Sequence, residues 1–295
     1  MKLTTLVFSG ASSKAPIYIG IYRCLLEYSI INPQLDGIQE IITCSIGLVF
    51  TIYLLFQVTI EVQELMTLRL NFLQLLDIEN VNIHNLLFDN GLFNNSKVVS
   101  LVKSVIHQKC GKSDITLKEL YDIKPIKITV KCVNITQGYV EYINHENHPN
   151  LSILTLLQMT TSIPIFFKPV EYNQCLYVDG GLMGGFPIEQ TSDNYLGFNI
   201  ESKSQPIQLL DEIPLLNFMY SLLKVKNVNY EDYSDEHIIN YQSNIHFTNF
   251  DISNIQKKEL IQHGYEITKQ HIETYKITND LFNEHPEDSN PTETV

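Results

Sequence analysis

The chain has 295 residues, of which 44% are hydrophobic and 18% charged, and its formal net charge is −13. This composition predicts a folded protein with a large buried core and argues against global disorder. The acidic balance argues against a nucleic-acid partner, because phosphate binding requires lysine and arginine on the contact face. It also provides no electrostatic attraction to anionic membranes.

The cysteines and the apolar segments indicate where such a chain would reside. The cysteines form no CxxC pair and no metal-type spacing with histidine, which predicts reduced, mostly buried thiols in a cytoplasmic protein. They are Cys24, Cys44, Cys110, Cys132 and Cys175. The N-terminal apolar run is too short for a signal-peptide core. Residues 41–60 lack charged side chains, but their polar residues and flanking glutamates favour a buried strand and helix over a membrane span.

Apolar runs and helical stripes alternate over the first 60 residues. Residues 3–8 predict a strand covered on both faces, and residues 16–30 a helix with Pro16 in its first turn. Residues 38–44 predict the next strand and residues 46–58 the next helix. This alternation is typical of a three-layer α/β/α fold with a mainly parallel central sheet.

The remainder of the chain continues the pattern less regularly. Residues 126–135 alternate like a strand with one wet face, and residues 175–178 predict a strand that ends at Asp179. Further helices are predicted over 95–106 and 151–162, and a last core strand over 195–200. We expect one domain over residues 1–282, followed by a flexible acidic tail over 283–295.

Ser45 stands at the corner between the second predicted strand and the helix after it, in "IITCSIGLVF" (41–50). A tight strand-to-helix turn presents a serine hydroxyl beside the free N–H groups of a helix N-terminus. The usual signature is G-x-S-x-G, and here Gly47 is present while Thr43 replaces the first glycine. The turn therefore predicts a nucleophile, with an ordinary helix cap as the alternative.

A second stretch, "YVDGG" (177–181), supplies a carboxylate. Asp179 follows an apolar strand and precedes Gly180 and Gly181, where the backbone can turn sharply. A carboxylate at such a strand end can accept the proton of a serine hydroxyl from a neighbouring strand end. The alternative is a common Asp-Gly turn.

The loop "SGASSKA" (9–15) connects the first strand to the first helix. Its small residues allow backbone N–H groups to converge, which is the arrangement that an acyl oxyanion requires. Lys14 could add positive charge there or fix the loop in place. A plain small-residue connector is the alternative.

Together and in this order, these segments resemble the patatin-like phospholipase family. Its pattern is an S-G-G-G-x-[R/K]-G loop after the first strand, then G-x-S-x-G and D-G-[G/A]. "SIPIFFKPV" (162–170) is similar to the family's approach to its aspartate, and the resemblance spans residues 3 to 275. It implies a dyad without histidine, in which Ser45 is the nucleophile and Asp179 the base. It also implies an oxyanion hole at Gly10, Ala11 and Ser12, with Lys14 at the family's Arg/Lys position.

The substrates that the resemblance implies are phospholipids or other fatty-acyl esters, reached by transient peripheral contact with a membrane. The dyad requires no metal and no cofactor. Apolar runs over 163–167 and 214–223 are expected to be core segments, with a lipid-facing lid as the alternative. No sequence feature specifies an oligomeric state.

Departures from the family pattern leave two other functions open. The family's glycines are replaced at Ala11, Ser12, Ala15 and Thr43, and a positive φ at such a position would cost on the order of 1 kcal/mol. A catalytically weak or inactive lipid- or protein-binding protein is therefore one alternative. An α/β-hydrolase with a Ser–Asp–His triad is another, because four histidines follow Asp179: His237, His246, His263 and His271.

Overall fold

The computed structural model describes residues 3–76, 88, 90–191, 194–202, 236–246 and 249–277. A central sheet has the strand order β10-β9-β1-β2-β4-β8-β7, and β5 also pairs with β4. Its strands are β1 (Thr5–Phe8), β2 (Glu40–Cys44), β4 (Lys127–Asn134), β5 (Tyr139–Ile143), β7 (Val170–Tyr172), β8 (Cys175–Asp179), β9 (Tyr195–Ser202) and β10 (Ile238–Ser243). A two-stranded sheet pairs β3 (Gly91–Phe93) with β6 (Ile165–Phe167).

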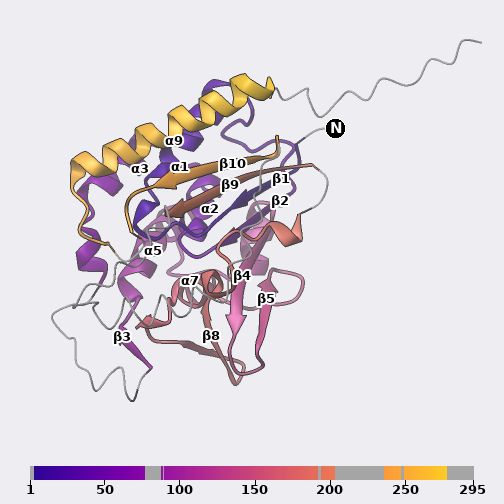
Figure 1. Cartoon of the computed structure of the whole chain (residues 1–295). Helices are drawn as coiled ribbons and strands as arrows, with labels where there is room; N and C mark the ends of the chain where they lie inside the picture. The colour runs from indigo at the N-terminus through magenta and orange to yellow at the C-terminus, as the bar shows by residue number, and fades with distance from the viewer. Residues whose placement is uncertain are drawn as a thin grey trace, which may run out of the picture.

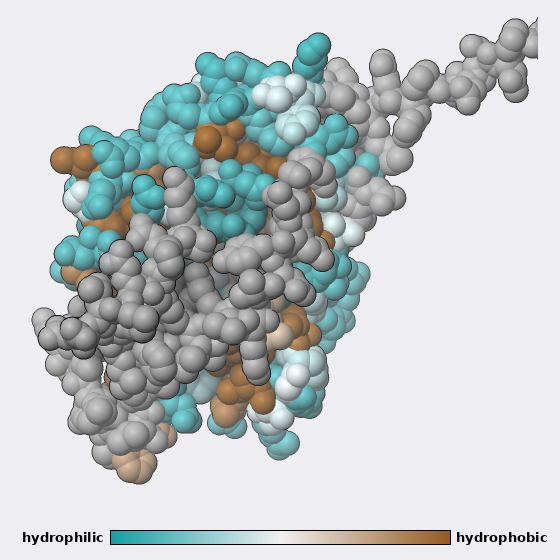
Figure 2. Space-filling view, viewed as in Figure 1, coloured by the Kyte–Doolittle hydropathy of each residue, from teal (hydrophilic) through white to brown (hydrophobic). Residues whose placement is uncertain are grey.

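Helices flank the central sheet, and α9 lies alongside α1 at one side of the molecule (Figure 1). The α-helices are α1 (Ile17–Glu27), α2 (Gly47–Leu55), α3 (Ile60–Arg69), α5 (Ser96–Cys110), α6 (Leu117–Ile123), α7 (Ile153–Thr161) and α9 (Asn254–Tyr275). Short 3-10 helices are η1 (Ser12–Lys14), η2 (Phe72–Leu75), η4 (Gly180–Met183) and η5 (Ile188–Gln190). Mostly hydrophilic residues cover the described surface over α9 (Figure 2).

The predicted fold class is confirmed. Strands β10, β9, β1, β2 and β4 run parallel to one another. Strands β5 and β8 pair with β4 in the antiparallel direction. The chain therefore has an α/β fold with a mostly parallel central sheet. Because parallel strands are covered on both faces, continuous apolar runs rather than alternating ones form them.

Alternate residues of β1 and β2 enter different cores. Leu6, Phe8 and Ile41 belong to the large core that the helices complete, and the Phe8 ring stacks on Phe198. Val7 and Ile42 point to the opposite face, where they pack with Phe186 and Ile238. Both faces of β1 and β2 are thus buried, which accounts for the apolar residues at successive positions in them.

Most predicted elements of the core are confirmed with ends shifted by a few residues, but two predictions are wrong. The strand over 195–200 is not the last core strand, because β10 follows it and pairs with β9. The expected wet face of the strand over 126–135 is the other. In β4 the polar side of the alternation is covered, and Lys131 is 2% exposed. The cause is the segment after β8, which lies over this face: Gly180 packs on Lys131, and Lys131 Nζ donates to the Met183 carbonyl and to Glu189. A period-two pattern identifies the strand but does not show that another segment covers its polar face.

The charge-free stretch over 41–60 is a strand and a helix, β2 and α2, as predicted. No helix in the described part of the chain is long and apolar enough to cross a membrane. All five cysteines are free thiols, and Phe166 and Phe167 of the 163–167 run are buried. The run over 214–223, the tail over 283–295 and the domain limit at 282 lie outside the described residues.

Strand register brings three distant segments to one place. Because β1 and β2 are parallel with Phe8 opposite Thr43, the loop after β1 and the turn at Ser45 leave the same edge of the sheet. Strand β2 ends at Cys44, opposite Lys131 of β4. One residue further along β4, the antiparallel β8 ends with Asp179 opposite Cys132. The end of β8 therefore meets the end of β2.

Candidate active site

Ser45 and Asp179 form a buried hydrogen-bonded pair. The Ser45 hydroxyl donates to Oδ2 of Asp179 at 2.6 Å, although the two residues are 134 positions apart. Their exposed fractions are 7% and 4%. The other carboxylate oxygen accepts the Gly181 N–H at 2.7 Å and contacts the Cys44 thiol at 3.8 Å. Both oxygens of the carboxylate are thus held, and one of them is directed at the serine.

The backbone at Ser45 is strained in the manner of a sharp corner. Its φ is +54°, in the left-handed region that costs a non-glycine residue about 1–2 kcal/mol. The corner is close-packed as well, because a Cβ at Gly47 would lie 2.4 Å from the Thr43 hydroxyl oxygen and 3.0 Å from the Ser9 carbonyl oxygen. The helix-cap alternative is wrong: Ile46 occupies the cap position of α2, and the Ser45 hydroxyl bonds to Asp179.

Thr160 of α7 forms hydrogen bonds that support the turn at Ser45. The sequence did not indicate this contact. The Thr160 hydroxyl accepts the Ser45 N–H at 2.8 Å and donates to the Lys131 carbonyl at 2.9 Å. All three groups are buried. Thr160 therefore links the strained turn to the strand that pairs with both β2 and β8.

Thr160→Val is expected to destabilise the protein by about 1–3 kcal/mol, because it removes the acceptor of the buried Ser45 N–H and one hydrogen bond to the buried Lys131 carbonyl. Thr160→Ser keeps the hydroxyl and should recover most of the loss. Urea denaturation of the two variants and the parent measures both effects. Equal stability of the valine and serine variants would show that the hydroxyl does not support the corner.

Burial dominates the electrostatics of Asp179. Loss of solvation raises its pKa from 3.8 to about 6, although the hydrogen bonds from Ser45, Gly181 and Cys44 act in the opposite direction. A carboxylate with this pKa is mostly ionised at neutral pH and is a stronger base than a solvated aspartate. The site thus holds a usable base beside the serine hydroxyl.

The structure sorts the residues of the loop over 9–15 into different roles. The Gly10 N–H donates to the Gly185 carbonyl at 2.8 Å, which removes it from the predicted oxyanion donors. Within the described residues, the N–H groups of Ala11 and Ile46 have no acceptor. The φ of Ser12 is +49° and that of Ala11 is −129°, so only the first carries the strain expected from losing a glycine.

Lys14 ties the loop to strand β9. Its exposed fraction is 3%, and Nζ donates to the Ser202 hydroxyl at the end of β9 at 2.9 Å.

The N–H group of Ile46 was not among the oxyanion donors predicted from the sequence. The signal was available, because the residue after the nucleophile commonly supplies one oxyanion N–H in a strand–turn–helix corner.

An ion pair between the buried Lys131 and the exposed carboxylate of Glu189 holds the segment after Asp179. Lys131 Nζ donates to the Glu189 carboxylate at 2.6 Å and to the Met183 carbonyl at 3.1 Å. The Tyr142 hydroxyl donates to the same Glu189 oxygen. Gly180 packs on this strand so closely that a Cβ there would lie 2.5 Å from the Lys131 carbonyl oxygen. These contacts fix the turn that carries the carboxylate and also place the Gly185 carbonyl beside Gly10.

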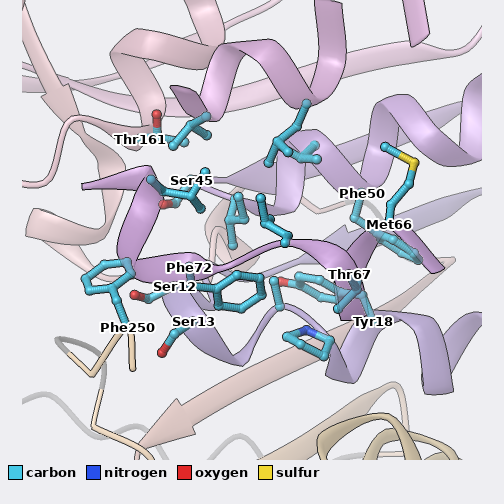
Figure 3. Close-up of a pocket in the computed structure, with 18 of the residues that line it drawn as sticks. Ser12, Ser13, Tyr18, Ser45, Phe50, Met66, Thr67, Phe72, Thr161 and Phe250 are labelled. Carbon is cyan, nitrogen blue, oxygen red and sulfur yellow. The ribbon is translucent and has the colours of Figure 1, made fainter. Parts of the chain in front are cut away.

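An apolar pocket of about 960 Å³, counting the part open to solvent, extends from Ser45. Figure 3 shows Ser45, Ser12 and Thr161 at one end, and Met66 and Thr67 at the other. Its wall comes from η1, α1, α2, α3, η2, α5 and the residues around β6. Such a volume and lining suit a ligand that is long and mostly apolar.

Histidines take no part in the serine–aspartate pair. Within the described residues, the hydrogen bonds of the Ser45 side chain and the Asp179 carboxylate involve one another, Gly181 and Cys44. His271, one of the four triad candidates, bonds instead to the backbone carbonyl of Glu236 at 2.9 Å. The described geometry therefore gives no support to a Ser–Asp–His triad.

These features define an α/β protein with a serine–carboxylate pair at the end of an apolar pocket. The chain belongs to the patatin-like phospholipase family, whose model matches residues 6–192. The predicted family is thus confirmed.

The chain is similar to one curated viral protein in sequence and to two bacterial proteins in fold. Over 189 residues the chain is 28% identical to "Probable lipid hydrolase 463L" of Invertebrate iridescent virus 6, a match that covers 63% of this chain and 62% of that protein. The fold resembles VipD from Legionella pneumophila, with a TM-score of 0.62, 16% identity and coverage of 93% and 67% of the two chains. It also resembles the type III effector ExoU of Pseudomonas aeruginosa, with a TM-score of 0.54, 13% identity and coverage of 94% and 54%.

Proposed function

We propose that the protein is a lipid acyl hydrolase that uses Ser45 as nucleophile and Asp179 as base. The observation that carries this proposal is the 2.6 Å hydrogen bond from the Ser45 hydroxyl to Oδ2 of Asp179, at one end of an apolar pocket. Membership in the patatin-like phospholipase family and the name of the viral relative support the reaction class. The proposed substrates are phospholipids or other fatty-acyl esters, reached by transient contact with a membrane surface.

The proposed reaction has two steps that use the same carboxylate. Asp179 takes the hydroxyl proton as Ser45 Oγ bonds to the ester carbonyl carbon, and the negative charge develops on the carbonyl oxygen. Collapse of this intermediate breaks the ester bond, and Asp179 returns the proton to the departing alcohol oxygen. In the second step Asp179 takes a proton from water, the hydroxide oxygen bonds to the acyl carbon, and Ser45 recovers its proton as the fatty acid leaves.

The oxyanion is proposed to bind the N–H groups of Ala11, Ser12 and Ile46. Ala11 and Ile46 are the two whose N–H groups have no acceptor within the described residues. Ser45 itself cannot contribute its N–H, because that group is donated to Thr160. Loss of one such donor typically slows acyl transfer about 10²- to 10³-fold, so the altered loop sets the rate rather than the reaction class.

A fluorophosphonate probe tests the proposal directly. We expect one label per chain, located at Ser45 by peptide mass spectrometry, and none in Ser45→Ala. A folded protein that remains unlabelled would favour the second candidate function, binding of lipid without turnover. The observations that favour that candidate are the strained Ser12 and the Gly10 N–H that is already donated to Gly185.

A further inference from the structure

Helix α3 presents one face to the apolar pocket. Three residues of the helix, Gln63, Met66 and Thr67, line the pocket at the spacing i, i+3 and i+4, and the C-cap residue Leu70 follows at i+7. This spacing places them along one side of the helix. Gln63 is the most deeply buried of them, with an exposed fraction of 1%, where a pattern of this kind ordinarily holds an apolar residue.

The amide of Gln63 is only half satisfied. Nε2 donates to the Val58 carbonyl at 2.8 Å, which fixes the orientation of the amide and assigns Oε1 to the opposite side. Oε1 is buried and receives no hydrogen bond from any described residue. An amide oxygen can only accept a hydrogen bond, so Oε1 requires an N–H or O–H donor.

Other polar side chains of the pocket wall do have partners. The Tyr18 hydroxyl donates to the Ser9 carbonyl, the Tyr53 hydroxyl to the Leu101 carbonyl at 3.4 Å, and the Thr161 hydroxyl to the Leu157 carbonyl at 2.7 Å. The second buried polar group without a hydrogen bond among the described wall residues is the Ser13 hydroxyl. Ser13 lies next to Ser12 in the nucleophile half of the pocket, away from the α3 side chains (Figure 3).

The position of Gln63 determines which part of a ligand would reach it. Met66 and Thr67, one turn further along α3, lie at the end of the pocket opposite Ser45 (Figure 3). An ester carbonyl placed at Ser45 would therefore send the distal part of its acyl chain toward α3. A buried acceptor without a partner is unfavourable unless the ligand brings a donor.

We propose that Gln63 is a specificity-determining residue that selects acyl chains carrying a hydroxyl group on their distal part, with that hydroxyl donating to Oε1. This inference rests on the proposed function, because it assumes that the acyl chain of the substrate occupies the pocket. An unsubstituted chain fills the same space but leaves Oε1 without a partner, so it binds less well.

The test compares p-nitrophenyl esters of one chain length that carry a single hydroxyl at different carbons, with the unsubstituted ester as reference. We expect one distal position to raise kcat/KM by about 5- to 10-fold, the effect of one additional hydrogen bond. In Gln63→Met, a side chain of similar shape without an acceptor, the ratio should fall to about 1. The ratio should persist in Ser13→Ala, which removes the other unsatisfied polar group. Each ratio is measured on one enzyme preparation and so does not depend on the folded fraction.

A binding measurement separates this inference from the proposed reaction. Displacement of a fluorescent fatty acid from Ser45→Ala should show tighter binding of the hydroxylated free acid than of the unsubstituted acid, and Gln63→Met in the same background should abolish the difference. If no ester is hydrolysed but this preference is found, the proposed reaction fails and the Gln63 site stands. If every hydroxylated chain binds and reacts no better than the unsubstituted chain, the inference is wrong and Oε1 is satisfied by water.

Discussion

Ser45→Ala is expected to lower the hydrolysis of fatty-acyl esters by about 10⁴-fold or more, because the acyl group then has no oxygen to which it can transfer. Asp179→Ala should have an effect of similar size, since the hydroxyl donates to this carboxylate and no other base contacts it within the described residues. Release of fatty acid from phospholipid vesicles and of p-nitrophenol from short esters measures the loss.

The matched control is Ser100→Ala, an exposed serine on α5 that should keep full activity. Because the two residues act as a unit, the double variant should lose little more than either single variant. Turnover that survives in a clean, folded Ser45→Ala preparation would contradict the proposed nucleophile. Circular dichroism and a urea transition establish that each variant is folded.

Asp179→Asn is expected to be inactive and yet more stable than the parent at neutral pH. The folded protein holds the carboxyl at a pKa of about 6, above its ordinary value of 3.8, because burial disfavours the charged form. A difference of this size corresponds to about 3 kcal/mol of unfolding free energy, an order-of-magnitude figure, once the group is ionised in both states. The neutral amide does not incur this desolvation cost and can still hydrogen-bond to Ser45 and Gly181.

The sign of the pH dependence follows from the same values. The protonated form is favoured in the folded state, so the stability that this group contributes is fully present below about pH 4. It is lost as the pH rises through about 6. Urea denaturation should therefore show nearly equal stabilities of parent and variant near pH 4, and a stability advantage of the variant at pH 8.

Activity should follow the opposite course with pH. Since the base must be ionised, kcat/KM of the parent should rise through pH 6 and level off above it. An asparagine variant that is no more stable than the parent at pH 8, together with a flat activity profile between pH 5 and 8, would show that the carboxyl is not a desolvated base.

Much of the fold and part of the site were readable in the sequence. Continuous apolar runs and helical stripes predicted the order of strands and helices, because burial repeats with the period of each element. Ser45 and Asp179 were identifiable because small residues and glycines follow each of them at the end of a predicted strand. The family pattern then related two stretches that are 134 residues apart.

Tertiary structure decided the contacts between these pieces. Whether Ser45 meets Asp179 depends on β8 running antiparallel to β4 and ending one residue beyond the end of β2. Tertiary contacts also determine that the Gly10 N–H donates to Gly185, that Lys131 is buried and that Oε1 of Gln63 has no donor among the described residues. Local sequence patterns indicate which positions of a helix or strand face the core. Strand order and register determine which distant residues come into contact there.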